Sequence, residues 1–176
     1  PMSAPAATTH TATTNAEAAV DDPAHVFHSW SAQALIDPLP IAGGEGAWFS
    51  GRVLYFTTTA DHRVWAHDVD AGTIEIIYDA ATYGSDAPLN DPDNVTVHER
   101  TGDIYVAEDA DDLQLVLLAN GHGRRIAEPF LQLTGHAGSE IAGPAFSPDG
   151  SRLYFTSQRG IDGKRGLSFE VTGPFS

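Results

Sequence analysis

The stretch RVLYFT at residues 52–57 recurs as DIYVA at 103–107 and as RLYFTS at 152–157. Each copy is a short run rich in β-branched and aromatic residues that follows a turn, which is typical of a strand. The central tyrosines, Tyr55, Tyr105 and Tyr154, are 50 and 49 residues apart. A period of roughly 40 to 50 residues made of strands and turns indicates stacked copies of one supersecondary unit.

Each repeat contains three or four strand-like runs, which predicts one propeller blade per repeat. The expected fold class is therefore all-β, a β-propeller of about three blades within residues 25–176. The expected blades are residues 43–81, 92–130 and 140–176. Closed propellers need about four to eight blades, so these blades either belong to a longer protein, which we expect, or close by association of copies. The exposed flanks of a three-blade arc would favour self-association.

The first 24 residues differ in composition from the rest. They are rich in Ala, Thr and Pro and show no hydrophobic period, which predicts a disordered tail or linker. Residues 25–41 contain short apolar stretches whose secondary structure the sequence leaves open.

Charge and composition narrow the function. The 176 residues carry a net charge of -15 and include one lysine, Lys164. This balance argues against nucleic-acid binding, which needs clustered Lys and Arg, and no apolar run is long enough to cross a membrane. The acidity suits a hard cation such as calcium, although it also serves solubility. With no cysteine in the chain, a disulfide or thiolate site within it is excluded.

The first strands of the three repeats are preceded by acidic or amide residues, four in all. They are Glu45, the neighbours Asp93 and Asn94, and Glu140. Equivalent positions on the innermost strands of a propeller converge on its central channel, so we expect these side chains to share one axial metal site. Carboxylate and amide oxygens are hard-cation ligands. The alternative is that each is a solvated turn residue.

Other polar residues have simpler interpretations. The acidic run that begins at Glu108-Asp109 is expected to be a solvated loop, with ligand or supporting oxygens as the alternative. The histidines His62, His67 and His98 show no metal-ligand spacing and are expected at surfaces or edges. Ser139 lacks a Gly-x-Ser-x-Gly context and is not expected to be a nucleophile, even with His136 close in sequence.

Arg159 follows the third tyrosine strand. Its guanidinium could bind an anionic substrate through two parallel hydrogen bonds, and we therefore include it as a candidate substrate-binding residue. A surface role is the alternative.

Several motifs together resemble one protein family. They are EGAW (45–48), DNVTV (93–97), GDIYVAED (102–109), SEIAGPAFSPDG (139–150) and LYFTSQRG (153–160). Over roughly residues 43–176 the chain resembles the C-terminal half of the PhoX-type bacterial alkaline phosphatases. The resemblance implies a six-bladed propeller, export by the twin-arginine route to the periplasm or beyond, and hydrolysis of phosphomonoesters at a calcium and iron cluster. It also places Glu45 and Glu140 on acidic metal ligands of the family.

The chain departs from the family pattern at two points. The resemblance implies a cysteine iron ligand from the N-terminal half, which this chain lacks, and an arginine at the position of Gly138. The EGAW and DNV motifs are also similar to those of calcium-dependent lactonases of the gluconolactonase type. A non-catalytic propeller that serves as a binding module is the third interpretation.

Overall fold

The computed structural model describes residues 11–12, 32–33, 41–109, 112–121 and 124–175. The chain divides into two compact units, Pro1–Pro40 and Ile41–Ser176. In the first unit β1 (Thr11–Ala12) pairs antiparallel with β2 (Ala32–Gln33). Apart from these strands, the tail predicted at residues 1–24 and the apolar stretches at 25–40 lie outside the described residues. Among the described residues, no helix has the length and apolar character needed to cross a membrane.

The second unit consists of three antiparallel sheets in which each strand pairs with the next along the chain. The first sheet contains β3 (Gly44–Ser50), β4 (Val53–Thr58), β5 (Arg63–Asp68) and β6 (Thr73–Asp79). The second contains β7 (Pro92–His98), β8 (Asp103–Glu108), β9 (Gln114–Gly121) and β10 (Arg124–Gln132). The third contains β11 (Ile141–Phe146), β12 (Arg152–Ser157) and β13 (Leu167–Thr172). Two 3-10 turns, Ala80–Thr82 and Gly84–Asp86, lie in the connection from the first sheet to the second.

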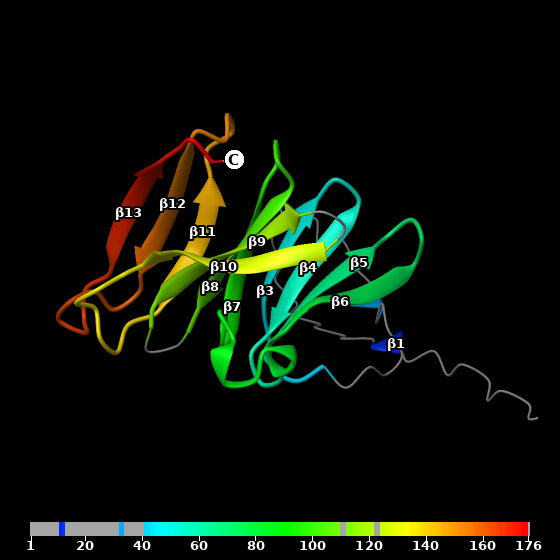
Figure 1. The fold of residues 1–176 in the computed structure, drawn as a ribbon, viewed down its shortest axis with the longest axis horizontal. Coiled ribbons are helices and arrows are strands. Elements are labelled where there is room, and N and C mark those ends of the chain that lie inside the picture. The colour runs from blue at the N-terminus through cyan, green and yellow to red at the C-terminus, as the bar shows by residue number, and fades with distance from the viewer. Residues whose placement is uncertain (1–10, 13–31, 34–40, 110–111, 122–123, 176) are drawn as a thin grey trace, which may run out of the picture. The chain divides into compact units, whose positions relative to one another are not determined.

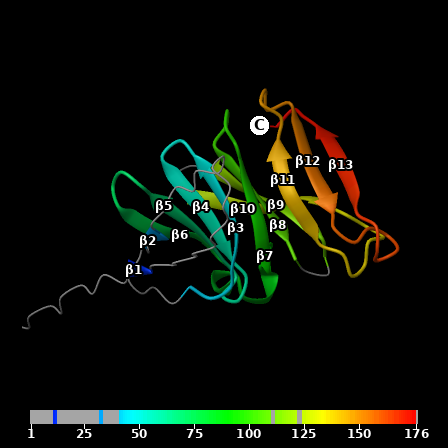
Figure 2. The ribbon, with the colours of Figure 1, turned by 180° about the vertical axis from the view of Figure 1, so that it is seen from behind.

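The sheets fan out from their first strands (Figures 1 and 2). Strand β7 contacts both β3 and β11, so the three first strands are neighbours in chain order. Short turns between consecutive strands allow this meander, because antiparallel neighbours need no crossover. The unit is an arc of three propeller blades, and the all-β prediction is confirmed.

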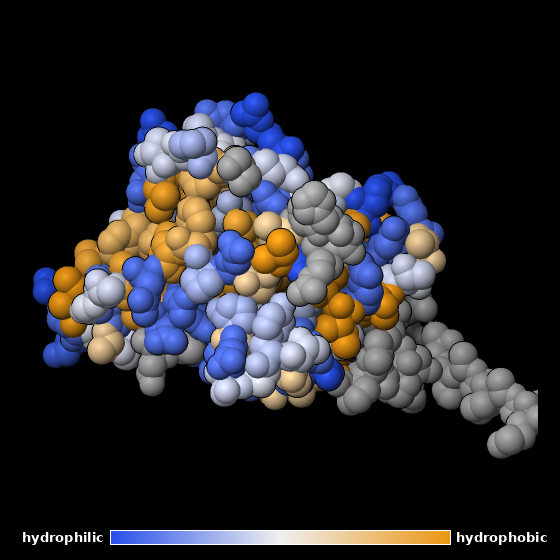
Figure 3. Space-filling view, viewed as in Figure 1, coloured by the Kyte–Doolittle hydropathy of each residue, from blue (hydrophilic) through white to orange (hydrophobic). Residues whose placement is uncertain are grey.

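Two hydrophobic cores hold the blades together, one on each face of the second sheet. The first core joins blades one and two and contains Val64, Tyr78, Ala80, Leu89, Val95, Val97, Ile104, Val106, Val116 and Leu118. The second joins blades two and three and contains Tyr105, Ala107, Leu113, Leu115, Ile141, Leu153 and Phe155. Burial of each large apolar side chain contributes about 1.5–3 kcal/mol. Hydrophobic residues are also visible over the third sheet (Figure 3).

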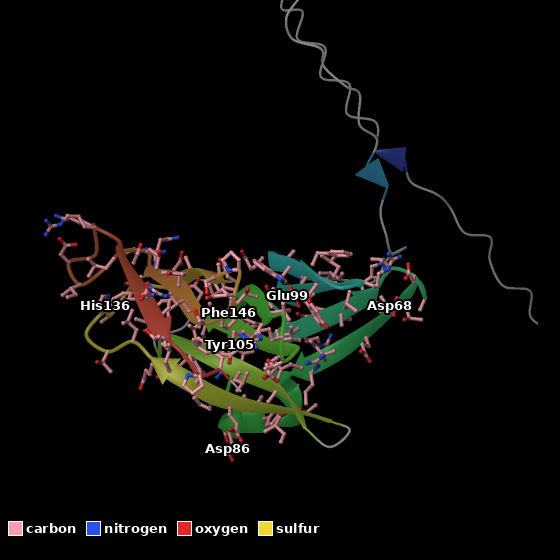
Figure 4. The ribbon with its side chains drawn as sticks, turned by 90° about the horizontal axis from the view of Figure 1, so that it is seen from above. Asp68, Asp86, Glu99, Tyr105, His136 and Phe146 are labelled. Carbon is pink, nitrogen blue, oxygen red and sulfur yellow. The ribbon has the colours of Figure 1, made fainter. Side chains whose placement is uncertain are left out.

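The three repeat tyrosines occupy the second strand of each blade, as the spacing predicted. Tyr55 packs against the first core, with the Arg125 guanidinium of the next blade 5.9 Å from its ring centre. Tyr105 likewise points to the next blade, and its ring centre lies 5.0 Å from that of Phe146 (Figure 4). Tyr154 lies on the corresponding face of the third blade and is 40% exposed. Each tyrosine therefore faces onward along the arc.

The onward face of the third blade is largely polar around Tyr154. Arg152 and Glu170 form an ion pair of 3.0 Å across β12 and β13, and the hydroxyls of Thr156 and Ser168 are 3.2 Å apart. This face is thus more polar than the two faces that form the cores.

The surface or edge position expected for the histidines is wrong for His67, which lies on the inner strand β5, whereas His98 lies on the edge strand β7. His67 and His98 are buried, whereas the side chain of His62 is 43% exposed. Both ring nitrogens of His98 have partners, the Thr101 hydroxyl at 2.9 Å and the Gly150 carbonyl at 3.1 Å. Satisfied hydrogen bonds allow a polar ring to be buried at modest cost.

Candidate metal centre

The candidate ligands of the first two blades lie in β-bulges. The pairing of β3 with β4 shifts register between Gly44 and Ala47, and that of β7 with β8 shifts between Pro92 and Val95. A bulge adds an unpaired residue and redirects its side chain away from the regular alternation. The bulges therefore set Glu45 and Asp93 apart from the ladder at equivalent positions.

A close backbone contact brings these two bulges together. A Cβ atom on Gly46 would lie 2.5 Å from the Asp93 carbonyl oxygen and 2.7 Å from the Asn94 Cα, so only glycine fits. The Thr57 hydroxyl accepts a hydrogen bond of 2.9 Å from the Gly46 N–H and donates to the Asp93 carbonyl. Glu45 and Asp93 are held on adjoining strands as a result.

Asn94 links the second blade to the third. Its Oδ1 accepts a hydrogen bond of 2.8 Å from the Gly143 N–H, which lies in the bulge of β11 between Ala142 and Ala145. Its Nδ2 donates to Asp93 Oδ1 at 2.5 Å. In this geometry Asn94 orients the Asp93 carboxylate, and its own oxygen is engaged by the neighbouring blade.

Glu140 lies at a different register position than expected. The Gln158 N–H donates to its carbonyl, just as Asp109 N–H donates to the carbonyl of Asp91 in the second blade. Glu140 therefore corresponds to Asp91, two residues before Asp93, and the expectation that Glu140 and Asp93 are in register is wrong. The loop before β11, rather than its bulge, supplies the third blade's carboxylate.

Arg159 lies beside Glu140. Its Nη2 is 3.1 Å from Glu140 Oε2, and its Nη1 donates to the Gly138 carbonyl at 3.3 Å. The Glu140 carboxylate is nearly buried, whereas the guanidinium is 44% exposed. The guanidinium thus lies beside the Glu140 carboxylate and is partly exposed to solvent.

Carboxylates of all three blades influence the pKa of Asp93. The pKa of Asp93 is raised to about 6, mainly by burial. The charges of Glu140, Glu45 and Asp109 also raise it, whereas the hydrogen bond from Asn94 lowers it. Like charges raise a carboxyl pKa when they are near. Even so, no three His, Asp or Glu side chains within the described ranges are close enough together to form a ready metal site.

Glu108 differs from the solvated residue that was expected. It is 1% exposed, and its Oε1 accepts a hydrogen bond of 2.6 Å from the Asn90 N–H. Burial raises its pKa to about 7 against the effect of that bond. Asp109, by contrast, is exposed, and its charge raises the pKa of Asp93. The sequence suggested a supporting role for Asp109 only as the alternative to a solvated loop. Its position directly after a strand was the feature that pointed to such a role.

Ser139 and His136 do not form a nucleophile and base. His136 Nδ1 contacts the hydroxyl of Ser157, not that of Ser139, at 2.8 Å. The Ser139 hydroxyl is buried and accepts a hydrogen bond from the Arg159 N–H. The expectation that Ser139 is not a nucleophile agrees with this geometry.

Fold and site together define a class of protein: a β-propeller with acidic groups gathered where its innermost strands begin. A family model described as alkaline phosphatase PhoX matches residues 44–160. The chain belongs to this family.

Two solved structures are similar to the chain. One, from a nidogen/laminin complex, has a TM-score of 0.57 at 15% identity and covers 78% of this chain and 51% of its own. The other, a streptogramin B lyase, has a TM-score of 0.49 at 20% identity and covers 78% of this chain and 43% of its own. The chain thus spans about half the length of these proteins. No curated protein sequence matches it.

Proposed function

We propose that the three blades belong to a metal-dependent phosphomonoester hydrolase of the PhoX type, and that their acidic region binds calcium. The observation that carries this proposal is the contact at Gly46, which joins the bulges of β3 and β7 and so holds Glu45 and Asp93 on adjoining strands. The charges of Glu45, Asp109 and Glu140 also act on Asp93, next to the larger effect of its burial. Concentrated negative charge on oxygen donors favours a hard cation. Membership of the PhoX family supplies the reaction class.

The residues have distinct roles in this proposal. Glu45, Asp93 and Glu140 hold the cation, and Asn94 orients Asp93 through its amide. Arg159 binds the phosphate group of the substrate, since guanidinium and phosphate form two parallel hydrogen bonds. A bound cation would polarise a phosphoryl oxygen and make bound water more acidic.

The donor set favours calcium over iron. All candidate ligands carry oxygen, and the chain has no cysteine to supply a thiolate. Calcium accepts six to eight oxygen ligands in flexible geometry, which suits carboxylates that come from three separate blades. We therefore assign the described residues to a calcium site, and any iron would need ligands from elsewhere.

Calorimetric titration with calcium tests the site. Glu45→Gln and Glu140→Gln should each weaken calcium binding about tenfold or more, because each removes a charged ligand while keeping the shape. The matched control is Glu170→Gln, which removes a carboxylate from the exposed pair with Arg152 and should leave the titration unchanged. Equal affinities for wild type, Glu45→Gln and Glu140→Gln would contradict the assignment.

Assays with phosphoesters and with lactones distinguish the proposed phosphatase from a lactonase and from a non-catalytic binding module. A lactonase of the gluconolactonase type would hydrolyse lactones but not phosphoesters, and a binding module would hydrolyse neither. We further propose, from the family alone, that the parent protein is exported; cell fractionation tests this.

A further inference from the structure

Behind Glu140 and Arg159 lies a chain of buried polar side chains that the proposed site does not use. His136 Nδ1 is 2.8 Å from the Ser157 hydroxyl, and that hydroxyl is 2.8 Å from the hydroxyl of Ser139. All three residues are buried. The ring centre of His136 lies 5.7 Å from that of Phe169 in the third sheet.

Neighbouring groups limit which hydrogen bonds the Ser139 hydroxyl can make. The Ser139 hydroxyl accepts from the Arg159 N–H at 2.9 Å, so its own hydrogen must be donated elsewhere. The Glu140 carbonyl is a poor choice, since it is 3.5 Å away and already accepts from Gln158 at 2.9 Å. Ser139, Ser157 and His136 Nδ1 thus form a continuous series of hydrogen bonds, whose donor order follows the tautomer of the His136 ring.

This hydrogen-bonded series of side chains connects the segment that carries Glu140 with the segment that carries Arg159. Glu140 directly follows Ser139, and the Ser139 hydroxyl holds the backbone of Arg159. The loop is also tied at its start, where the Ser139 N–H donates to the His136 carbonyl at 3.0 Å. Buried hydrogen-bonded networks of this kind restrict geometry, because loss of one member leaves the next unsatisfied.

We propose that His136 is a positioning residue which, through Ser157 and Ser139, sets the placement of Glu140 relative to Arg159. This inference rests on the proposed function in one respect: it takes Glu140 as a calcium ligand. His136 itself touches neither the carboxylate nor the guanidinium. Its effect is transmitted by the two hydroxyls.

Two substitutions of His136 distinguish positioning from packing. The side-chain oxygen in His136→Asn can occupy the place of Nδ1 and accept from Ser157, whereas that in His136→Gln reaches toward the place of Nε2. We expect calcium affinity, measured by calorimetry on the full chain, to stay within about threefold of wild type in His136→Asn. In His136→Gln and Ser157→Ala we expect it to fall about tenfold. Equal affinities in the two His136 variants would overturn the proposal.

A control and a second readout complete the test. The control is His98, which is also buried but lies at the end of β7 opposite to Asp93. His98→Gln should lower the stability measured in urea without changing the calcium affinity. The rate of hydrogen exchange at the Arg159 backbone amide reports on this hydrogen-bond network in the absence of calcium. That rate should increase in His136→Gln but not in His136→Asn. If the wild-type protein binds no calcium, the proposed function is wrong, and hydrogen exchange at the Arg159 amide alone tests the positioning role of His136. An unchanged exchange rate in His136→Gln would overturn that role.

Discussion

Gly46 lies where the first two blades approach closely at the candidate site. Its N–H is bonded to Thr57, and the space that a Cβ would need is occupied by the backbone of Asp93 and Asn94. Backbone atoms cannot rotate aside as a flexible side chain can. The chemistry of Glu45 therefore depends on the absence of a side chain at the next position.

We expect Gly46→Ala to lower the free energy of unfolding by about 2 kcal/mol, since overpacking forces the strands apart, and to weaken calcium binding. Urea denaturation and calorimetry measure the two effects. Gly44→Ala is the matched control, because a Cβ there meets nothing within 4 Å. Similar behaviour of the two variants would contradict the close approach.

Glu108 provides a pH-dependent prediction. Its pKa in the folded protein is raised from 4.5 to about 7, so between these values the folded state binds the proton more readily than the unfolded state. The contribution of Glu108 to stability therefore falls as the pH rises through this range. Glu108→Gln keeps the acceptor for Asn90 and removes the charge.

In the presence of a chelator, Glu108→Gln should be about 2 kcal/mol more stable than wild type at pH 8, a value reduced from the full pKa shift because relaxation and water screen the charge. At pH 4 the two proteins should be nearly equal. Denaturation curves at both pH values measure the difference. The matched control Glu75→Gln changes an exposed carboxylate; a gain at pH 8 as large as that of Glu108→Gln would contradict the role of burial.

At the scale of elements, β12 shows how one strand joins blades. Phe155 points back into the core with the second blade and is 4% exposed, whereas its neighbour Tyr154 is 40% exposed. Adjacent residues of a strand point to opposite faces. The strand therefore has one face committed to packing and one available.

Phe155→Ala should lower the free energy of unfolding by about 3–5 kcal/mol through loss of burial and formation of a cavity. Tyr154→Ala should cost less than about 1 kcal/mol, as expected for a more exposed site. Chemical denaturation of both variants measures the contrast. Similar losses would mean that the two faces of β12 are equally packed.

The whole molecule presents its acidic site on an arc of three blades. Metal-assisted hydrolysis needs a fixed metal geometry, a positioned nucleophile and a dry, shaped cavity. On the arc, Arg159 is 44% exposed beside Glu140, and electrostatic interactions in contact with water are weakened. We therefore expect the proposed cation binding to be separable from turnover of a substrate.

We expect the 176-residue chain to show little or no phosphatase activity, even with calcium and iron supplied. A full-length parent protein should release p-nitrophenol from its phosphate ester in a chelator-sensitive way. Robust chelator-sensitive turnover by the 176-residue chain would contradict the expectation. A parent that hydrolyses lactones but not phosphoesters would be a lactonase instead.

The sequence by itself determined the class of fold and the family. Alternating apolar residues, turn residues and a period near 50 residues specify strands, hairpins and blades, because each depends on neighbours in the chain. The equivalence of Tyr55, Tyr105 and Tyr154 was predictable for the same reason. The motifs around Asp93 and Glu140 were sufficient to indicate the PhoX family, which the match to residues 44–160 confirms.

Only the tertiary structure decided which polar groups meet. The register of Glu140, the burial of Glu108 and His98, and the contact of His136 with Ser157 depend on bulges, loops and neighbouring blades. Sequence spacing carries no record of these, because a bulge shifts a strand by one residue and each such shift moves a side chain to the opposite face. The pairing of Arg159 with Glu140 belongs here too, since it joins the loop before β11 to the end of β12, segments that lie together only when the third blade has folded.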